Sequence, residues 1–396
     1  MALTKNVTFA MAGTQSSGKT VALATFFHEM SSPNFIGDQY FNLTATGPFT
    51  RDLNRKYTAM RTNGMFPAGN LETSIYDMQF QADDVVMCDL SIRDHKGALF
   101  HQENAEEDKN YVELIQDLKH AALVVFLIGG DLVNKFIRLE NKSFTDPAEE
   151  IKIEGDLSDT LGAYRSLMNI VAKNEGGIRK PVIYYVTKSD LIDFRDDRQK
   201  MDCVKSLLAK YRLIGNTTKE IDRKVLICHS TLGRNLDFVP GENRIRATES
   251  IQPEGFEMPI LLTVGYAFST EGDRWEAQEY SKIDQMIRRE QDGIDEARDA
   301  ITRLDGRNWL AKIFTKKSTE AKKSGYIDEI TGRKSAIDDL AAQRAQVQHN
   351  NKMRDNAMHI LEYINKKNQE PGHLYTLYLD EHGSERPLQE FFAQNK

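Results

Sequence analysis

Cysteine is scarce in this sequence, and so are the long apolar runs that would carry a chain into a membrane. The three cysteines, Cys88, Cys203 and Cys228, include no CxxC spacing, which argues against a disulfide framework and a zinc site. The longest uninterrupted apolar run, residues 121–128, is far shorter than the ~20 residues that span a bilayer. Residues 1–13 contain no long apolar core, so we expect no secretory signal and a cytoplasmic location.

A large surplus of one charge is also missing. The chain has 52 lysines and arginines against 59 acidic residues, a net charge of −7, which disfavours a general nucleic-acid binder. Hydrophobic residues make up 40% and charged residues 28%, values typical of globular proteins, so a disordered or fibrous chain is excluded. A length of 396 residues indicates two or three structural units, or one enlarged domain with an appendage.

Short apolar runs alternate with helical patterns over the first two thirds of the chain. Strands are expected at 7–12, 123–128, 182–187, 225–229 and 260–264, and helices at 19–30, 111–118, 157–172 and 204–213. Residues 74–81 and 85–94 flank a turn and predict an antiparallel hairpin at the edge of the sheet. Buried strands separated by helices are typical of a parallel sheet covered on both faces. The predicted class is therefore α/β, with a doubly wound, mainly parallel sheet.

The C-terminal third has a different pattern, with heptad spacing of apolar residues. Tyr280, Ile287, Ile294 and Ile301 lie seven residues apart, and Glu290 interrupts the seam. A second helix is expected at about 335–367. We thus predict an α/β domain at 1–268, a helical hairpin or coiled coil at 269–370, and a tail at 371–396 that can form a short strand pair. Because residues 343–352 are polar, we expect part of the seam to need a second copy or a protein partner, through residues 275–365.

One motif carries specific chemistry. It follows a predicted strand, opens a predicted helix and has the form GxxxxGK[ST], whose backbone N–H groups cradle phosphate oxygens at a helix N-terminus. Its lysine would reach the β and γ phosphates, and its last hydroxyl would bind Mg²⁺. The motif indicates a nucleoside triphosphate site in a P-loop fold. Its residues are Gly13, Thr14, Gln15, Ser16, Ser17, Gly18, Lys19 and Thr20.

A second motif indicates which base is bound. Thr187, Lys188 and Asp190 follow the apolar strand 182–186 in an [NT]KxD pattern. A carboxylate at Asp190 can accept from guanine N1–H and the 2-amino group together, a donor pair that adenine lacks. The stem of Lys188 can lie over the base while its ammonium stays hydrated. Ser230 and Thr231, after the strand at 225–229, loosely match a further turn that touches the guanine oxygen.

Two aspartates compete for the role of organising Mg²⁺. Asp89 ends the apolar stretch VVMCD, and Asp94 begins a DxxG pattern that Gly97 completes. Alternation along the strand places Asp94 on the same face as Cys88 and Ile92, whereas Asp89 lies on the half-wet face. We therefore favour Asp94, with the Gly97 backbone donating to the γ phosphate.

These motifs resemble those of the TRAFAC-class GTPases, the group of Ras, the translation factors and the septins. The resemblance covers roughly residues 5–265, with inserts at 31–72 and 129–155, and implies a Mg²⁺-dependent site for GTP and GDP. The approach to the hairpin, FPAGN and LETS, is similar to predicted bacterial double-GTPase families linked to conflict systems. A helical hairpin after the GTPase core is similar, in general plan, to dynamin-like proteins.

The resemblance also implies a switch threonine and a group that orients the attacking water. Thr73 is the best position for the threonine, as a catalytic and metal-binding residue, and Asn70 is the second choice. Ras-like enzymes have glutamine immediately after DxxG, where this chain has Ala98; His95 and Gln102 could substitute. We thus expect a GTPase switch that is slow without a partner or a dimer. Two alternatives stay open: a non-hydrolysing GTP-bound interaction protein, and a dynamin-like membrane-associated GTPase.

The segment 305–323 is basic and carries Trp309 and Phe314 among its lysines. Basic residues around apolar ones can mark a membrane surface site. The same pattern also arises when aromatic side chains pack on the protein and lysines face water, and we favour that interpretation.

Overall fold

The computed structural model describes most of the chain. The described residues are 6–32, 34–36, 39–46, 50–67, 74–83, 85–95, 109–172, 181–194, 196–215, 223–233, 236, 239, 242, 244–246, 251–305, 309–350, 353–370, 376–380 and 382–392. The chain divides into two compact units. One, the sheet unit, comprises Ala2–Phe268 and Asn356–Lys396, and the other, the helical arm, comprises Ser269–Asp355. The arm is therefore shorter than the expected 269–370, because the chain returns to the sheet unit at residue 356.

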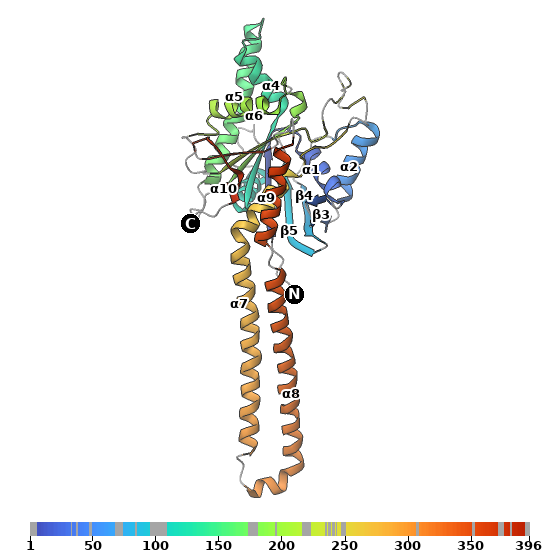
Figure 1. The fold of residues 1–396 in the computed structure, drawn as a ribbon, viewed down its shortest axis with the longest axis vertical. Helices are drawn as coiled ribbons and strands as arrows, with labels where there is room; N and C mark the ends of the chain where they lie inside the picture. Colours follow the sequence, from blue (N-terminus) through green and yellow to red (C-terminus); the bar gives the residue numbers. More distant parts are fainter. Residues whose placement is uncertain are drawn as a thin grey trace. The chain divides into compact units, whose positions relative to one another are not determined.

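A single mixed sheet forms the centre of the sheet unit (Figure 1), and its order is β10-β9-β8-β7-β6-β1-β5-β4-β3-β2. The strands are β1 (Asn6–Gly13), β2 (Asn34–Ile36), β3 (Gln39–Ala45), β4 (Ser74–Ala82), β5 (Val85–Asp94), β6 (Leu123–Gly129), β7 (Val182–Thr187), β8 (Lys224–Cys228), β9 (Thr376–Leu379) and β10 (Glu385–Arg386). The pairs from β5 through β1, β6 and β7 to β8 are all parallel. The central sheet is thus parallel, as the uninterrupted apolar strands predict.

Helices cover both faces of this sheet (Figure 1). The described helices of the whole chain are α1 (Lys19–Met30), α2 (Thr50–Asn63), α3 (Lys109–His120), α4 (Gly130–Glu140), α5 (Pro147–Ala172), the 3₁₀ turn η3 (Ser189–Leu191), α6 (Asp197–Lys210), α7 (Met258–Asp305), α8 (Trp309–Asn350), α9 (Met353–Asn368) and α10 (Leu388–Phe392). Of these, α8 and the part of α7 beyond Phe268 belong to the arm and not to the sheet unit. Because parallel strands all end at the same edge of the sheet, the loops that follow β1, β5, β6, β7 and β8 gather there.

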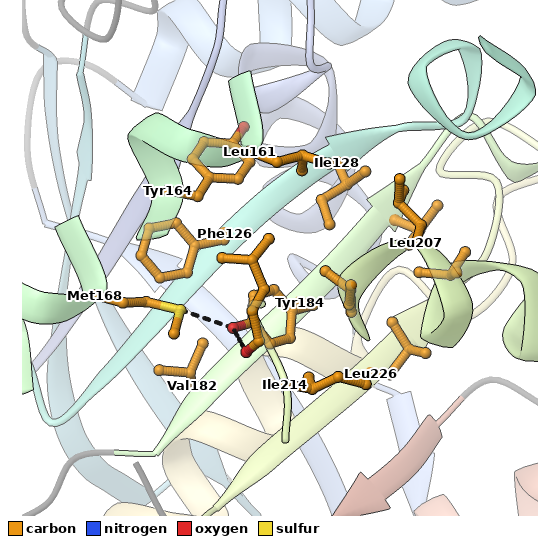
Figure 2. Close-up of a cluster of buried hydrophobic side chains, with 14 of the residues drawn as sticks. Phe126, Ile128, Leu161, Tyr164, Met168, Val182, Tyr184, Leu207, Ile214 and Leu226 are labelled. Atoms are coloured by element: carbon orange, nitrogen blue, oxygen red, sulfur yellow. Dashed lines mark hydrogen bonds between the residues drawn. The ribbon is translucent and has the colours of Figure 1, made fainter. Parts of the chain in front are cut away.

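One face of the sheet packs against α3 to α6 (Figure 2). Phe126 of β6 and Tyr184 of β7 lie in the middle of this core, and Leu161 and Met168 of α5 pack around them. The Tyr184 hydroxyl donates to the Leu213 carbonyl oxygen at 2.7 Å and contacts the Met168 sulfur at the same distance. A buried hydroxyl with a partner avoids the desolvation cost of an unpaired one, so these contacts fix the strand and helix layers together.

The other face carries the first part of α7, where the sequence predicted a strand at 260–264. That prediction was wrong, because Ile260, Leu262 and Val264 belong to a continuous helix that starts at Met258. This helix end is buried all round, so its apolar run lacks the helical periodicity that would distinguish it from a buried strand. The Cβ position of Gly265 would lie 2.6 Å from Phe392 of α10, which shows how closely the two helices pack.

Both edges of the sheet differ from the sequence prediction. The hairpin of β4 and β5 forms with antiparallel pairing, but β3 and β2 extend the sheet beyond β4, so the hairpin is not at the edge. At the other end, β9 pairs antiparallel with β8, and β10 pairs with β9 as the short strand pair that was predicted for the tail. The C-terminal residues therefore complete the sheet, and they do not form a separate tail.

The helical arm consists of α7 beyond Phe268 and α8, which lie side by side (Figure 1). The second helix begins at Trp309, not near Ser335 as predicted, so most of the basic segment 305–323 is helical. Side chains of 306–317 are outside the described set. The seam residues Ile283, Ile294, Ala297 and Leu304 are buried. The seam residues Tyr280, Ile287 and Ile301 are half-buried.

The polar residues of the arm explain how the two helices pair. Glu290, which interrupts the apolar seam, has its Oε2 3.0 Å from Nη1 of Arg333 on α8. Nearer the sheet unit in sequence, the Arg344 guanidinium lies over the Tyr280 ring, 5.6 Å from its centroid, and contacts Asp284 at 3.4 Å. The Arg344 stem on α8 therefore covers part of the seam at Tyr280.

Candidate functional site

The loop between β1 and α1 has the backbone of a phosphate-binding turn. β1 ends at Gly13 and α1 begins at Lys19. Gly18 has φ 84°, a conformation that residues with a side chain rarely adopt, and its missing Cβ would lie 3.2 Å from the Thr187 hydroxyl. Ser16 also has positive φ, at 64°. The strain at a non-glycine residue is typical of a functional turn. Successive residues in such conformations can turn their backbone N–H groups into one concavity that binds anions.

The side chain of Lys19 lies against the backbone of this loop. Its Nζ donates to the carbonyl oxygen of Gly13 at 2.6 Å and to that of Thr14 at 3.3 Å. Burial lowers the pKa of Lys19, and the nearby Asp94 charge opposes that shift. A buried ammonium held only by carbonyl oxygens at the end of a strand is well placed to exchange them for phosphate oxygens.

Thr20 and Asp94 lie together at the start of α1. The Thr20 hydroxyl donates to Asp94 Oδ2 at 3.0 Å, and Asp94 is almost fully buried. Burial raises the pKa of Asp94, while Lys19 and the Thr20 hydrogen bond act against that rise. The competing Asp89 is half-buried on the opposite face of β5, where it accepts from Gln79. Alternation along the strand therefore places Asp94, and not Asp89, beside the loop.

This pair of oxygens suits a divalent cation. Mg²⁺ is usually bound by one or two protein oxygens together with waters and substrate phosphates, so a threonine hydroxyl and one carboxylate are a sufficient protein contribution. The raised pKa of the buried Asp94 carboxyl means that a nearby cation would stabilise its charged form. Within the described ranges, no cluster of three or more His, Cys, Asp or Glu side chains forms a metal site.

The segment after β7 is hydrogen-bonded directly to the loop after β1. The Thr187 hydroxyl donates to the Ser17 carbonyl oxygen at 2.6 Å. Lys188, with a left-handed φ of 56°, extends its ammonium to the Ser16 carbonyl oxygen at 2.7 Å. These side chains, about 170 residues away in sequence, thus hold the backbone of the turn by hydrogen bonds. The two motifs found separately in the sequence form one site.

Asp190 is held by the loop after β8. The Ser230 hydroxyl donates to Asp190 Oδ1 at 2.6 Å, and this hydrogen bond does not involve Oδ2 of the same carboxylate. Burial raises the pKa of Asp190, and the Ser230 hydrogen bond partly offsets that rise. Thr231 is also brought near, but its hydroxyl lies 3.2 Å from the Tyr185 hydroxyl and not at Asp190. The neighbouring His229 is fully buried, and burial lowers its pKa to about 3, so its ring is neutral.

Tyr164 of α5 is a contributor that the sequence analysis missed. Its hydroxyl accepts from the Thr14 backbone N–H at 3.1 Å and donates to the Leu127 carbonyl oxygen at 2.6 Å. Burial raises its pKa to about 12, so the hydroxyl stays protonated. It also lines a cavity of about 350 Å³ beside the loop, together with Gln15, Asp131 and other residues. No local motif marks Tyr164, because its partners are 37 and 150 residues away.

Some of the expected site residues cannot be placed. Thr73 and Gly97, expected to act in catalysis, lie outside the described residues, as do Asn70, Ala98 and Gln102. His95 is described and is buried, and its Nε2 lies 2.9 Å from Oδ2 of Asp117 on α3. It therefore does not face the solvent side of the site.

The geometry and topology are compatible with a P-loop-type fold: a mixed α/β structure with a mostly parallel central sheet. No protein-family model matches the chain, and no curated protein matches it. A solved structure, the S. cerevisiae Ski7 GTPase-like domain bound to GTP, is similar with a TM-score of 0.30 and 18% identity. The match covers 60% of this chain and 46% of that one. Among the helices that the structure describes, none combines the length and apolar character that crossing a bilayer requires.

Proposed function

We propose that this protein is a Mg²⁺-dependent GTP-binding and GTP-hydrolysing switch that controls its helical arm. The observation that carries the proposal is the pair of hydrogen bonds from Thr187 and Lys188 to the carbonyl oxygens of Ser17 and Ser16. They join a base-selecting segment to a phosphate-binding turn at the end of a parallel sheet. Together the two segments provide the residue types needed to bind the base and the phosphates of one guanine nucleotide.

Each residue has a role that follows from its chemistry. Lys19 exchanges its two carbonyl partners for phosphate oxygens and stabilises charge on the transferred phosphoryl group. Thr20 and Asp94 would hold Mg²⁺, which supplies charge neutralisation between the phosphates. Asp190, oriented by Ser230, accepts from two donors on guanine. Thr73 and Gly97 are proposed to complete the site at the γ phosphate.

Slow turnover is part of the proposal. The residue after the DxxG pattern is Ala98, which has no side-chain group that could orient water. A partner or a second copy, bound through residues 275–365, is proposed to supply that group, and the arm is the part proposed to respond to it. The same alanine favours one alternative, a GTP-bound interaction protein that does not hydrolyse its nucleotide. Phosphate release under multiple-turnover conditions separates the two.

Base selectivity gives the first test. The protein should bind GTP and GDP at least ~10-fold more tightly than ATP, since hydrogen bonds to a charged group contribute about 1.5–3 kcal/mol. Asp190→Asn should lose most of that preference and favour xanthine nucleotides, whose 2-oxo group is an acceptor. Asp193→Asn is the matched control, because Asp193 lies three residues further on and is exposed. Calorimetry that shows ATP binding as tightly as GTP would refute the guanine assignment.

A further inference from the structure

A carboxylate on α3 lies against both sequence neighbours of the proposed metal ligand. Asp117 Oδ1 is 2.9 Å from Arg93 Nη1, and Asp117 Oδ2 is 2.9 Å from His95 Nε2. Arg93 and His95 flank Asp94 in the chain. The single side chain of Asp117 therefore contacts the residue before and the residue after Asp94.

The strand register shows on which side of the sheet this contact lies. In the parallel pair of β1 and β5, Met11 is opposite Asp94 and Ala10 is opposite Arg93. Ala10 belongs to the core that α3 covers, together with Leu114 and Leu118 of that helix. Residues opposite each other in a sheet share a face, and successive residues alternate. Asp94 is thus directed to the α1 side, where Thr20 lies, while Arg93 is directed to the α3 side.

The Asp117 carboxylate is buried to an extent that is unusual for a charged group, and the His95 ring beside it is buried as well. Asp117 is 7% exposed and His95 is 1% exposed. Carboxylates are costly to bury unless their charge is compensated, and removing one member of a buried cluster leaves the others uncompensated. The cluster of Arg93, His95 and Asp117 is therefore disturbed when the charge of Asp117 is removed. It lies on the far side of β5 from Lys19 and Thr20, so it does not touch the nucleotide site.

We propose that Asp117 is a positioning residue for Asp94, and that it sets how tightly the site holds Mg²⁺. This inference rests on the proposed function. The end of β5 is held from one side by Thr20 and from the other by Asp117, so the Asp94 carboxylate stays where a cation beside Thr20 needs it. The same contact ties α3 to the metal ligand, so a change at the metal reaches α3 through His95.

The test measures the release of fluorescently labelled GDP from the full chain across a series of Mg²⁺ concentrations and in EDTA. Asp117→Asn keeps the size of the side chain but removes its charge. We expect the Mg²⁺ concentration that half-maximally slows release to rise about 10-fold, the lower end for groups that hold a metal ligand in place. Release in EDTA should change by less than about twofold, because Asp117 does not touch the nucleotide.

Two further variants make the result specific. Asp77→Asn is the matched control, since Asp77 is an exposed carboxylate on β4 that accepts from the Ser91 hydroxyl at 2.9 Å, and it should behave as wild type. Arg93→Gln removes one of the two contacts of Asp117, the one with the more exposed partner. It should give a smaller rise in the half-maximal Mg²⁺ concentration, and it keeps the test available if Asp117→Asn fails to fold.

Three results would overturn the inference. The first is an unchanged Mg²⁺ dependence in both variants. The second is faster release in EDTA by the same factor as in Mg²⁺, which would indicate a merely structural role. The third is a wild-type chain that binds GDP without any Mg²⁺ dependence. A wild-type chain that binds no guanine nucleotide at all would instead refute the proposed function, and the inference with it.

Discussion

Replacing Tyr164 by phenylalanine removes a single hydroxyl that joins α5 to the loop between β1 and α1 (the phosphate loop of the proposed function). The change leaves the ring in place against Phe126, 5.2 Å away between centroids, so packing is preserved. The Thr14 N–H and the Leu127 carbonyl oxygen lose their shared partner. A buried group left unsatisfied costs about 1–3 kcal/mol, so the free energy of unfolding should fall by roughly that amount.

The same change should weaken nucleotide binding, because Thr14 is the first residue of the loop. A loop that samples other conformations has a smaller fraction competent to bind, and a cost of about 1.4 kcal/mol at this point corresponds to a tenfold loss of affinity. Tyr184→Phe is the matched control. Tyr184 is equally buried, and its hydroxyl also donates to a backbone carbonyl, but that carbonyl belongs to Leu213 and not to the strands or the loop of the site.

Urea unfolding and calorimetry with GDP give the two readouts. Both variants should lose stability, and only Tyr164→Phe should lose affinity for GDP. Equal affinities in the two variants would refute the argument that this hydroxyl organises the loop. A normal stability of Tyr164→Phe would show that water or a shifted backbone satisfies both groups.

Three other predictions concern rate, pH and the arm. Lys19→Ala should abolish GTP hydrolysis, and the unmodified chain at high dilution should turn over at ~10⁻⁴–10⁻² s⁻¹; a rate above about 1 s⁻¹ in a phosphate-release assay would mean that the chain supplies its own water-orienting group. His229, with its pKa lowered from 6.5 to about 3, takes up a proton on unfolding, so its contribution is complete above pH 6.5 and is lost as pH falls toward 3. At pH 5 this lowers the free energy of unfolding by about 2 kcal/mol. His229→Gln should remove this difference between the unfolding free energies measured in urea at pH 7 and at pH 5. Arg333→Glu places like charges beside Glu290 and Glu329, so hydrogen exchange in α7 and α8 should speed up while GDP affinity stays unchanged; unaltered exchange in the arm would contradict the pairing.

Local patterns in the sequence predicted the parallel strands and the elements that carry the site. The alternation along β5 distinguishes Asp94 from Asp89, because successive side chains of a strand point to opposite faces of the sheet. The glycine positions and the strand before Lys19 predicted the turn for a similar reason. In both cases the decisive interactions are between residues close in sequence.

Contacts between distant residues account for what could not be predicted. Residues 260–264 were expected to form a strand, since a short apolar run fits a buried strand and a buried helix end equally well. The position beside β8 belongs to β9, more than a hundred residues later. Tyr164 and Asp117 have no motif around them, and their importance comes only from the partners that the fold brings to them.

The pairing of β9 with β8 has a consequence for the order in which the protein can fold during synthesis. Residues Thr376–Leu379 leave the ribosome after the whole of the arm, so β8 has an unpaired edge while about 150 further residues are made. An exposed strand edge invites pairing with other chains. The arm is an insertion between two parts of the sheet unit, and a shorter connection from Phe268 to Asn356 would bring β9 to its place sooner. A chain with the arm replaced in this way should aggregate less during translation than one truncated after the arm, which would lack β9 entirely.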